Sequence, residues 1–539
     1  MQKFFVLLAL LFVTHSGDAQ PDFAYRLTVE ARQIPQMPAL HSFVYAQHAH
    51  YWLFLGGRQD GIHARQPFNA FPASGINQHI WLVDRTNDSL YSLPISDLPD
   101  TLNYQLQCTN INFFQDGEYL FMAGGYGIWP PTNQYTTPAL LSRIHLPGLI
   151  NSILQQQANP AAFSVVRDSL FAITGGQMGK LNGEYLLIGG HYFQGRYNPM
   201  GPNNGPGFIQ HYSNQIRKFS ANADSLPLQF SAGQSITDAV HLHRRDYNLL
   251  PQIFPNGEPG YMISSGVFQQ TADLPFLYPV DIGATAYRPR TDFHQLLSHY
   301  HGAKLVLYDS STLTNHNLFF GGLAQYYLDT GGQMVQDNDV PFVNTISRVS
   351  RDQRDSLYEF KELAEMPVFV GAGSAFLPNP VLPKYAHGLI NMNRFPNDTI
   401  ELGHVIGGIV SPVRNAFTTN TTSLTAAGTT VYRVLLIPEP SSTGISMKQS
   451  IPPYDFVMGP NPTQGRFKLK FELFKVVDVH YLLTASDGSI IEKGRLGDLE
   501  VGNNLVSFDL RHRKQTEQLV VTLIFENKHF VSKKLLLRK

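Results

Sequence analysis

A set of basic side chains stands where it could bind an anion: Arg244, Arg245, His301 and His387, with His41 as a further polar residue of the same rim. The guanidinium group of arginine offers a planar set of donors that matches a carboxylate or a phosphate. These residues could therefore receive an acidic group of a ligand. The alternative is structural, because Arg245 and Asp246 could form an ion pair between neighbouring units of the fold.

A second set of residues is rich in aromatic rings and lies in long loops: Tyr126, Trp129, Tyr192, Arg196 and Tyr326. The same kind of loop also holds Arg58, His63 and Tyr197. Tyrosine and tryptophan present flat faces to sugar rings or peptide side chains. We predict that both sets line one binding surface. The triplet Asp337-Asn338-Asp339 offers oxygen ligands, but it lacks the rest of a Ca²⁺-binding pattern and is expected to be a turn. We predict no metal and no cofactor.

The elements that must position these side chains are repeated. An apolar strand that ends in Gly-Gly occurs at residues 53–57, 120–125, 186–190, 318–322 and 404–408, and a degenerate copy ends in Ser-Ser-Gly at 261–266. Asp-Gly or Asn-Gly turns precede three of these strands, which predicts a hairpin from a first strand a into the Gly-Gly strand b. Such repetition indicates a repeat fold.

Two further strands complete each unit. An alternating segment such as 79–83, 214–219 or 344–349 predicts strand c. The motif Asp-Ser-Leu, at Asp88, Asp168, Asp224 and Asp355, predicts strand d. The last unit has its strand a near 388–390 and lacks a strand d, and the strand at 24–30 is unpaired. We therefore predict a six-bladed β-propeller whose N-terminal strand closes the last blade.

The topology of the predicted propeller brings the candidate residues to one face. The strands alternate in direction, so the d-to-a and b-to-c loops emerge on the same face, and the first residues of strand a rim the central channel there. The basic set lies at these strand starts and the aromatic set lies in the b-to-c loops. Loops on a rigid scaffold are common binding sites.

Composition limits the function. The net charge of −1 gives no basic field for nucleic acid. With the single cysteine Cys108, no internal disulfide can form. Lys3, the apolar run at 4–13 and the small residues 17–19 are typical of a signal peptide. No other apolar stretch is long enough for a transmembrane span.

The Gly-Gly strands, the segment Ile80-Trp81-Leu82-Val83-Asp84 and the Leu98-Pro99 pair resemble kelch repeats over about residues 24–437. The tryptophan that kelch units have in strand d is replaced here by Leu90-Tyr91 or Leu357-Tyr358. This resemblance implies a kelch propeller and little about function. It also implies two enzymatic alternatives, both carbohydrate-active.

The first alternative is a copper radical oxidase similar to galactose oxidase. It would use side chains of the set Cys108, Tyr126, Tyr300, His301 and His387. The second alternative is a sugar-acid epimerase similar to the sialic acid mutarotase, which would use Arg244 and His301 with a neighbouring carboxylate.

The residues after 453 change pattern. Pro460-Asn461-Pro462-Thr463-Gln464-Gly465, the Asp487-Gly488 hairpin and the terminal Lys533-Lys534-Leu535-Leu536-Leu537 resemble the type A sorting domain of the type IX secretion system of Bacteroidetes-like bacteria. The alternating strands predict a small β-sandwich. The resemblance implies passage through the secretion machinery and release or attachment at the outer surface.

We therefore predict four segments: a signal peptide at 1–19, a propeller at 20–437, a linker at 438–453 and a sorting sandwich at 454–539. The predicted function is a secreted or surface-attached module that binds a glycan or a protein through its loop-rich face.

Overall fold

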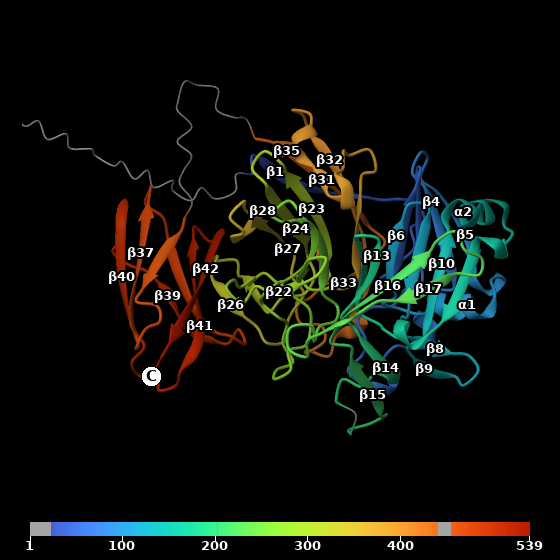
Figure 1. Ribbon diagram of the computed structural model, residues 1–539, viewed down its shortest axis with the longest axis horizontal. Coiled ribbons are helices and arrows are strands. Elements are labelled where there is room, and N and C mark those ends of the chain that lie inside the picture. Colours follow the sequence, from blue (N-terminus) through green and yellow to red (C-terminus); the bar gives the residue numbers. More distant parts are fainter. Residues whose placement is uncertain (1–22, 202, 440–453, 539) are drawn as a thin grey trace, which may run out of the picture.

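The computed structural model describes residues 23–201, 203–439 and 454–538, and these residues are mainly β-strand (Figure 1). The predicted all-β class is confirmed. The predicted signal peptide at 1–19 and most of the predicted linker at 438–453 lie outside the described residues. No helix in the described part of the chain is long and apolar enough to cross a membrane.

Six antiparallel units of four strands each account for most of the fold. In order from strand a to strand d, unit 1 is β2 (Val44–His48), β3 (Tyr51–Leu55), β4 (His79–Asp84) and β5 (Ser89–Pro94), unit 2 is β6 (Asn112–Asp116), β7 (Tyr119–Ala123), β10 (Leu140–His145) and β11 (Phe163–Arg167), and unit 3 is β12 (Gln177–Leu181), β13 (Glu184–Ile188), β16 (Gln215–Asn222) and β17 (Gln229–Ala232), with β18 (Ile236–Thr237) also on β16. Unit 4 is β19 (Asn248–Ile253), β20 (Pro259–Ser264), β21 (Val280–Ile282) and β22 (Tyr287–Pro289), unit 5 is β23 (Ala303–Asp309), β24 (Thr314–Phe320), β27 (Thr345–Arg351) and β28 (Leu357–Glu365), and unit 6 is β30 (Ser374–Pro378), β32 (Ile400–Gly407), β35 (Val431–Pro438) and β1 (Tyr25–Arg32).

Smaller elements extend the loops. They are the hairpins β8 (Gly127–Trp129) with β9 (Gln134–Thr136), β14 (His191–Gly195) with β15 (Phe208–Tyr212) and β25 (Tyr326–Leu328) with β26 (Met334–Gln336), the sheet of β29 (Phe369–Val370), β33 (Ile409–Ser411) and β34 (Ala426–Ala427), the short β31 (Ile390–Asn391), and the helices α1 (Asp100–Leu106) and α2 (Leu146–Gln155).

Unit 6 joins the two ends of the propeller chain. Strand β1 pairs with β35 from Tyr25 opposite Pro438 to Arg32 opposite Val431. The strand a predicted at 388–390 was wrong, because β30 pairs with β32 and fills that place. Residues Ile390 and Asn391 instead form β31, which pairs in parallel with β23 of unit 5. The apolar residues after Gly388 thus form only a short strand in the neighbouring unit, and Ser374–Pro378 is strand a of unit 6.

Backbone hydrogen bonds join the units around a central axis. Six residues at the starts of strands a have left-handed conformations, and we call them the axial ring: Ser42, Asn110, Gly175, Asp246, His301 and Gly373. The N–H of Ser42 donates to the carbonyl of Gly373 (2.9 Å), and the N–H of Gly373 donates to that of His301 (2.8 Å). Asn110, Gly175 and Asp246 donate in the same way to the preceding ring member (3.1, 3.2 and 2.7 Å).

The Gly-Gly pairs form the second link between units. In Gly124-Gly125 both residues have positive φ, and the N–H of Gly125 donates to the carbonyl of Ile173 in the next unit (3.0 Å). A Cβ atom on Gly124 would lie 1.8 Å from that carbonyl oxygen. Only glycine fits this conformation and this approach, which explains the repeated signature.

One motif prediction was wrong. The Asp-Ser-Leu motif at Asp168 does not begin strand d of unit 2, because that strand is β11 and ends at Arg167. The carboxylate of Asp168 instead accepts a hydrogen bond from the N–H of Leu170 (2.8 Å) and begins a 3₁₀ turn. Aspartate favours such local bonds wherever a turn begins, so the motif marks a turn rather than a strand.

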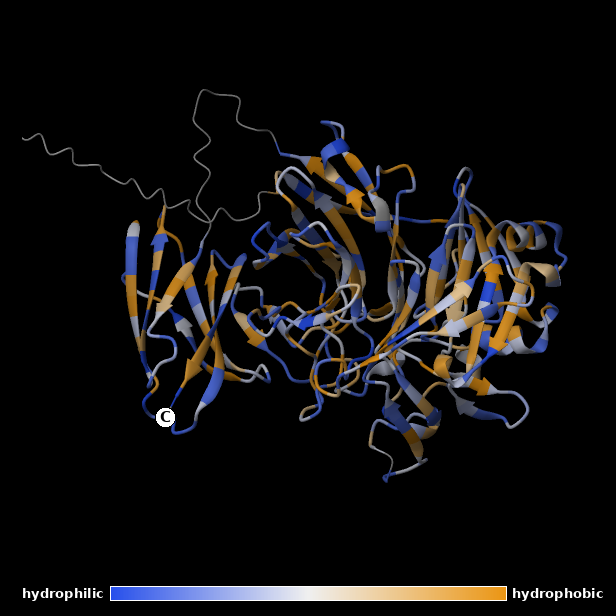
Figure 2. Cartoon of the chain, in the orientation of Figure 1, coloured by the Kyte–Doolittle hydropathy of each residue, from blue (hydrophilic) through white to orange (hydrophobic). Residues whose placement is uncertain are grey.

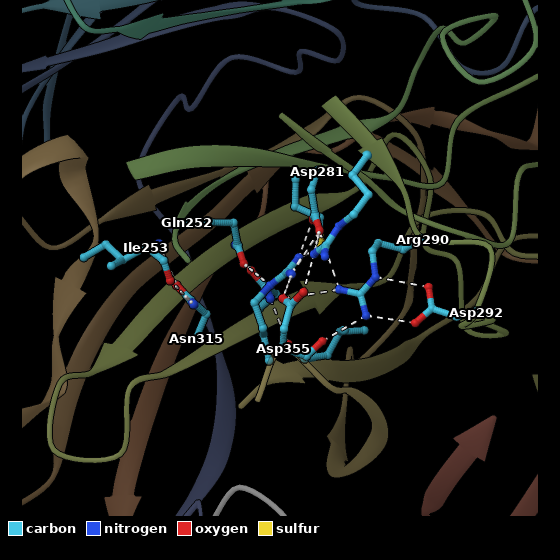
Figure 3. Close-up of polar contacts among 12 residues, drawn as sticks. Gln252, Ile253, Asp281, Arg290, Asp292, Asn315 and Asp355 are labelled. Carbon is cyan, nitrogen blue, oxygen red and sulfur yellow. Dashed lines mark hydrogen bonds and ion pairs between the residues drawn. The ribbon is translucent and has the colours of Figure 1, made fainter. Parts of the chain in front are cut away.

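Units 4 and 5 are joined differently. The axial-ring link and the Gly-Gly link are both missing at this interface among the described residues. A cluster of three arginines and three aspartates fills the interface instead, and Figure 3 shows part of its network: Arg288, Arg290, Arg351, Asp281, Asp292 and Asp355. The Arg351 side chain is fully buried and contacts both Asp281 and Asp355.

The C-terminal residues form a two-layered sandwich, which lies beside unit 5 (Figure 1). One sheet is β36 (Phe456–Gly459), β37 (Arg466–Leu473) and β40 (Gly502–Asp509), and the other is β38 (Val479–Ala485), β39 (Ile490–Arg495), β41 (Glu517–Phe525) and β42 (His529–Leu537). Strand β37 alternates exposed and buried residues, the pattern of one sheet face packed on a core (Figure 2). Strand β42 also pairs with β28 of unit 5, so the second sheet continues that unit.

Candidate functional site

Two cavities lie along the axis and meet at the axial ring. The loop-side cavity has a volume of about 190 Å³ and is built from strand a starts and b-to-c loops of all six units. The channel cavity has a volume of about 330 Å³ and is lined by the strands a themselves. Ser42, Asn110, Asp246 and His301 line both cavities.

A simple register rule describes much of the wall of the loop-side cavity. In every unit the residue before the axial ring and the residue after the Gly-Gly pair, or after its degenerate copy, line this cavity. The first group is His41, Thr109, Thr174, Arg245, Tyr300 and Ala372, and the second is Arg58, Tyr126, His191, Val267, Leu323 and Ile409. The two groups pair across the strand ends, as in the bridges His41 to Arg58 and Thr109 to Tyr126.

The buried Arg58 and the partly buried Asp60 form an ion pair in the wall of this cavity. Arg58 donates from Nε to Asp60 Oδ1 (2.8 Å) and from Nη2 to Asp60 Oδ2 (2.6 Å) and the Pro72 carbonyl (2.7 Å). His41 Nε2 lies 3.5 Å from Asp60 Oδ1. Burial alone would raise the pKa of Asp60, but hydrogen bonds from His41 and Arg58 outweigh burial and lower that pKa. Asp60 is therefore an ionised acceptor.

Arg245 and Asp246 form a second pair in the same cavity. The Nη1 atom of Arg245 donates to Asp246 Oδ2, its Nε atom donates to the Tyr212 hydroxyl (3.2 Å), and its guanidinium lies 5.1 Å from the centre of the Phe268 ring. Burial opposes the charge on Arg245, but Tyr212 and Asp246 together raise the pKa of this arginine. Its Nη2 atom has no hydrogen-bond partner among the described residues, so one donor group is free for a ligand.

Aromatic rings line the cavity beside these pairs, and the Arg58 guanidinium lies 5.2 Å from the centre of the Phe71 ring. The rings of Phe71 and Tyr126 meet edge to face at 5.7 Å between centres, and Tyr197 lies 5.7 Å from Phe71. The Tyr126 hydroxyl donates to the Gly195 carbonyl (2.8 Å) and accepts from the Tyr197 N–H (3.2 Å). His63 packs on Phe71 and Tyr197, and burial lowers the pKa of His63 to about 4.

The cavity is therefore balanced in charge at neutral pH. It holds two arginines and two aspartates in pairs. Burial also lowers the pKa values of His41, His191 and His301, which favours their neutral forms. Such a site offers hydrogen-bond donors, acceptors and aromatic faces without net charge.

Of the ten residues predicted as a site, four line the loop-side cavity: His41, Tyr126, Arg245 and His301. Arg244 lies behind the wall and is fully buried. Its guanidinium stacks on Phe276 and Tyr278 (4.0 and 4.8 Å) and donates to three backbone carbonyls. The structure thus gives Arg244 local partners and turns it away from the cavity.

His387 lies at the other cavity. It belongs to the long connection between β30 and β32, and its Nε2 atom contacts the Gly260 carbonyl (3.1 Å). Its ring centre lies 4.6 Å from that of Tyr261. The misplaced strand a of unit 6 explains why the sequence argument assigned His387 to the opposite face.

The remaining four predicted residues lie outside both cavities. Trp129 packs on Tyr104 (4.4 Å), the Tyr192 hydroxyl donates to Gln194 (2.9 Å), and Arg196 donates to the Phe68 carbonyl (2.5 Å). Tyr326 is fully buried beneath the sandwich, where its hydroxyl donates to the Gly488 carbonyl. These side chains sit on hairpins that project from the rim.

The cavity wall also contains residues outside the ten predicted ones: Arg58, Asp60, His63, Phe71 and Tyr197. The sequence places Arg58, His63 and Tyr197 in b-to-c loops, and the register rule applies to Arg58 because it follows Gly57 directly. Asp60 and Phe71 were not predicted, because no local pattern marks their positions in a b-to-c loop. Cys108, named for the copper alternative, is fully buried, and its Sγ atom faces the Tyr104 carbonyl (3.5 Å). Among the described residues, no three His, Cys, Asp or Glu side chains are grouped to hold a metal ion.

Comparisons with known proteins give distant similarities only. No family model matches the chain, and no curated protein is significantly similar. The structure of YjhT shares 9% sequence identity over 75% of this chain and 99% of its own, with a TM-score of 0.39. A fungal alcohol oxidase of the AA5 family in complex with copper shares 8% over 96% and 100%, with a TM-score of 0.39. A glycoside hydrolase family 43 arabinoxylan arabinofuranohydrolase from Bacillus subtilis shares 9% over 94% and 97%, with a TM-score of 0.27.

Proposed function

We propose that this protein binds an uncharged glycan in the loop-side cavity. The observation that carries the proposal is the pairing of Arg58 with Asp60 and of Arg245 with Asp246 inside a wall of aromatic rings. Sugar hydroxyls donate and accept hydrogen bonds at once, and adjacent guanidinium and carboxylate groups can satisfy both roles. The faces of Phe71 and Tyr126 can cover the apolar C–H surface of a sugar ring.

The balanced charge of the cavity favours a neutral sugar over an acidic one. An acidic sugar would have to compete with Asp60 for Arg58 and with Asp246 for Arg245. Each arginine already pairs with a carboxylate, so an acidic sugar would gain less attraction from the arginines. It would also be repelled by the negative charges of Asp60 and Asp246. The earlier expectation of an acidic group at Arg244 and Arg245 is replaced in this proposal by a neutral sugar.

The cavity size favours a glycan over a protein partner. A volume of about 190 Å³ suits one sugar residue or the end of a chain rather than a flat protein surface. The proposal keeps the kelch-like character of the propeller, which the Gly-Gly strands support. It also keeps export with a C-terminal sorting domain, which the signal-like N-terminal sequence and the sandwich at 456–537 support.

A glycan array with the full-length protein tests the proposal. The matched variants are Asp60→Asn in the cavity and Arg196→Met on a hairpin outside it. We expect selective binding to uncharged glycans, a loss of about 10- to 100-fold in affinity with Asp60→Asn, and no change with Arg196→Met. Selective binding of sialylated or uronic-acid glycans would contradict the charge argument, and an empty array would contradict the glycan proposal.

The carbohydrate-active enzyme alternative is tested on the same samples. Glycans that bind should be incubated with the protein and then analysed by mass spectrometry and anomeric NMR. We expect unchanged glycans, as for a binding module. Oxidation or epimerisation that Asp60→Asn abolishes would replace the binding proposal with the enzyme.

A further inference from the structure

The channel cavity contains a lysine without a counter-ion. Lys304 lies on β23, and its side chain lines the channel cavity at the position three residues after the axial ring. The equivalent positions of the other units carry Tyr45, Phe113, Met178, Leu249 and Phe376, and all of these also line the cavity. One ammonium group therefore stands in a girdle of aromatic and aliphatic side chains.

No charge in the described part of the chain compensates Lys304. Its ammonium has no ion pair and no hydrogen bond there. Asp246 is the one carboxylate among the lining residues, and Arg245 already pairs with it. His301 and His387 line the same cavity and carry no negative charge. Burial accordingly lowers the pKa of Lys304 to about 8.

The Lys304 side chain is half-buried, and an ammonium that is partly removed from water without a counter-ion is costly, so proteins normally pair such groups. An anion that entered the channel would relieve this cost. The girdle of Tyr45, Phe113 and Phe376 would at the same time cover an apolar body attached to that anion. A ligand that meets both conditions carries a negative charge on an apolar body.

We propose that the channel cavity is a second binding site, which takes a small carboxylate with an apolar body. The carboxylate contacts the Lys304 ammonium, and the apolar body packs against the girdle. Gln177 and Asn248 also line the cavity, but their amide nitrogens already donate to the Tyr247 and His299 carbonyls, so Lys304 is the group that binds the carboxylate. The site is independent of the glycan proposal, because it lies on the other side of the axial ring.

The test uses the full-length protein with benzoate and hexanoate as probes and benzamide as the neutral analogue. Affinity is measured by saturation-transfer NMR and calorimetry. We expect both carboxylates to bind with Kd below about 10 mM and benzamide to bind at least about 10-fold more weakly. Lys304→Met should weaken carboxylate binding at least about 10-fold, whereas Lys304→Arg should retain most of it because it keeps the charge.

Lys475→Met is the control, because Lys475 is exposed and pairs with Glu526 on the sandwich. A second readout is trace acetylation followed by mass spectrometry. Benzoate should protect Lys304 and leave Lys475 unchanged. The proposal is overturned if neither carboxylate binds the wild-type protein, if Lys304→Met binds them as tightly as the wild type, or if benzoate leaves Lys304 unprotected.

Discussion

Arg–Asp ion pairs occur both in the interface between units 4 and 5 and in the loop-side cavity, but the arginines of the two regions differ in how many of their donors have partners. In the interface, all three guanidinium nitrogens of Arg351 have partners: Gln252 for Nε, Asp281 and Asp355 for Nη1, and Asp281 and the Met262 sulfur for Nη2. In the cavity, Arg245 is partly buried, and its Nη2 atom has no hydrogen-bond partner among the described residues. All donors of Arg351 therefore serve the fold, whereas Arg245, which lines the cavity, keeps one donor for a ligand.

The same comparison explains where the cluster lies. The other five interfaces have at least one backbone link, from the axial ring or from the second glycine of a Gly-Gly pair. Unit 4 has Ser265-Gly266 in place of Gly-Gly, and neither link to unit 5 is present in the described chain. The Arg–Asp cluster and the side-chain bond from Asn248 to the His299 carbonyl (2.8 Å) connect the two units instead.

The largest predicted effect is on stability at this interface. Arg351→Met should lower the free energy of unfolding by about 3–5 kcal/mol, because it leaves the buried Asp281 and the partly buried Asp355 with less compensation. Urea denaturation followed by fluorescence measures the change, and Arg196→Met is the control, with an expected change of no more than about 0.5 kcal/mol. An Arg351→Met protein as stable as the wild type would show that the cluster does not hold the two units together.

The second effect is on binding in the cavity. Asp60→Asn should weaken glycan binding by about 10- to 100-fold, while the free energy of unfolding should fall by no more than about 2 kcal/mol, because the amide can still accept from Arg58. Calorimetric titration with the best array glycan and a parallel urea curve separate the two quantities. Equal losses in Asp60→Asn and Arg351→Met protein would mean that this pair is structural as well.

Lys304→Met should stabilise the folded protein, in contrast to Arg351→Met. At pH 7 the folded pKa of about 8 lies below the usual lysine value, so the buried charge destabilises the folded state. Removing the charge should raise the free energy of unfolding by about 1–3 kcal/mol at pH 7. This gain should disappear as pH rises from about 8 to above 10, where the folded protein already holds a neutral amine while the unfolded chain still binds the proton.

Thermal unfolding of the wild-type and Lys304→Met proteins across that pH range measures the difference. A variant that is less stable than the wild type at pH 7 would show that the ammonium has a favourable partner in the channel.

Local sequence patterns predicted most strands of the propeller but only some of the residues that line the loop-side cavity. Gly-Gly pairs and Asn-Gly turns follow from backbone conformation, so they located strands a and b in most units. The strand predicted at Asp168 was wrong because an aspartate side chain can accept a backbone hydrogen bond in a turn as readily as at the start of a strand. The positions of Asp60 and Phe71 depend on how one long b-to-c loop folds back over Arg58, and no local pattern encodes that path.

The smallest predicted effect is the pH dependence of glycan binding. Burial lowers the pKa of His63 to about 4, and it lowers the pKa values of His41, His191 and His301 as well. His63 should therefore be neutral from pH 6 to pH 8, and the lowered pKa values favour the neutral forms of the other three histidines, so affinity should change less than about 2-fold over this range. Below pH 6 the unfolded chain, with ordinary histidine pKa values near 6.5, binds protons that the folded cavity excludes, and stability falls as pH drops toward 4. Titration calorimetry at pH 6, 7 and 8 measures the affinity, with His48→Gln outside the cavity as the control. A steep change over this range would mean that a charged histidine contacts the sugar, and the paired carboxylates would then no longer suffice to explain binding.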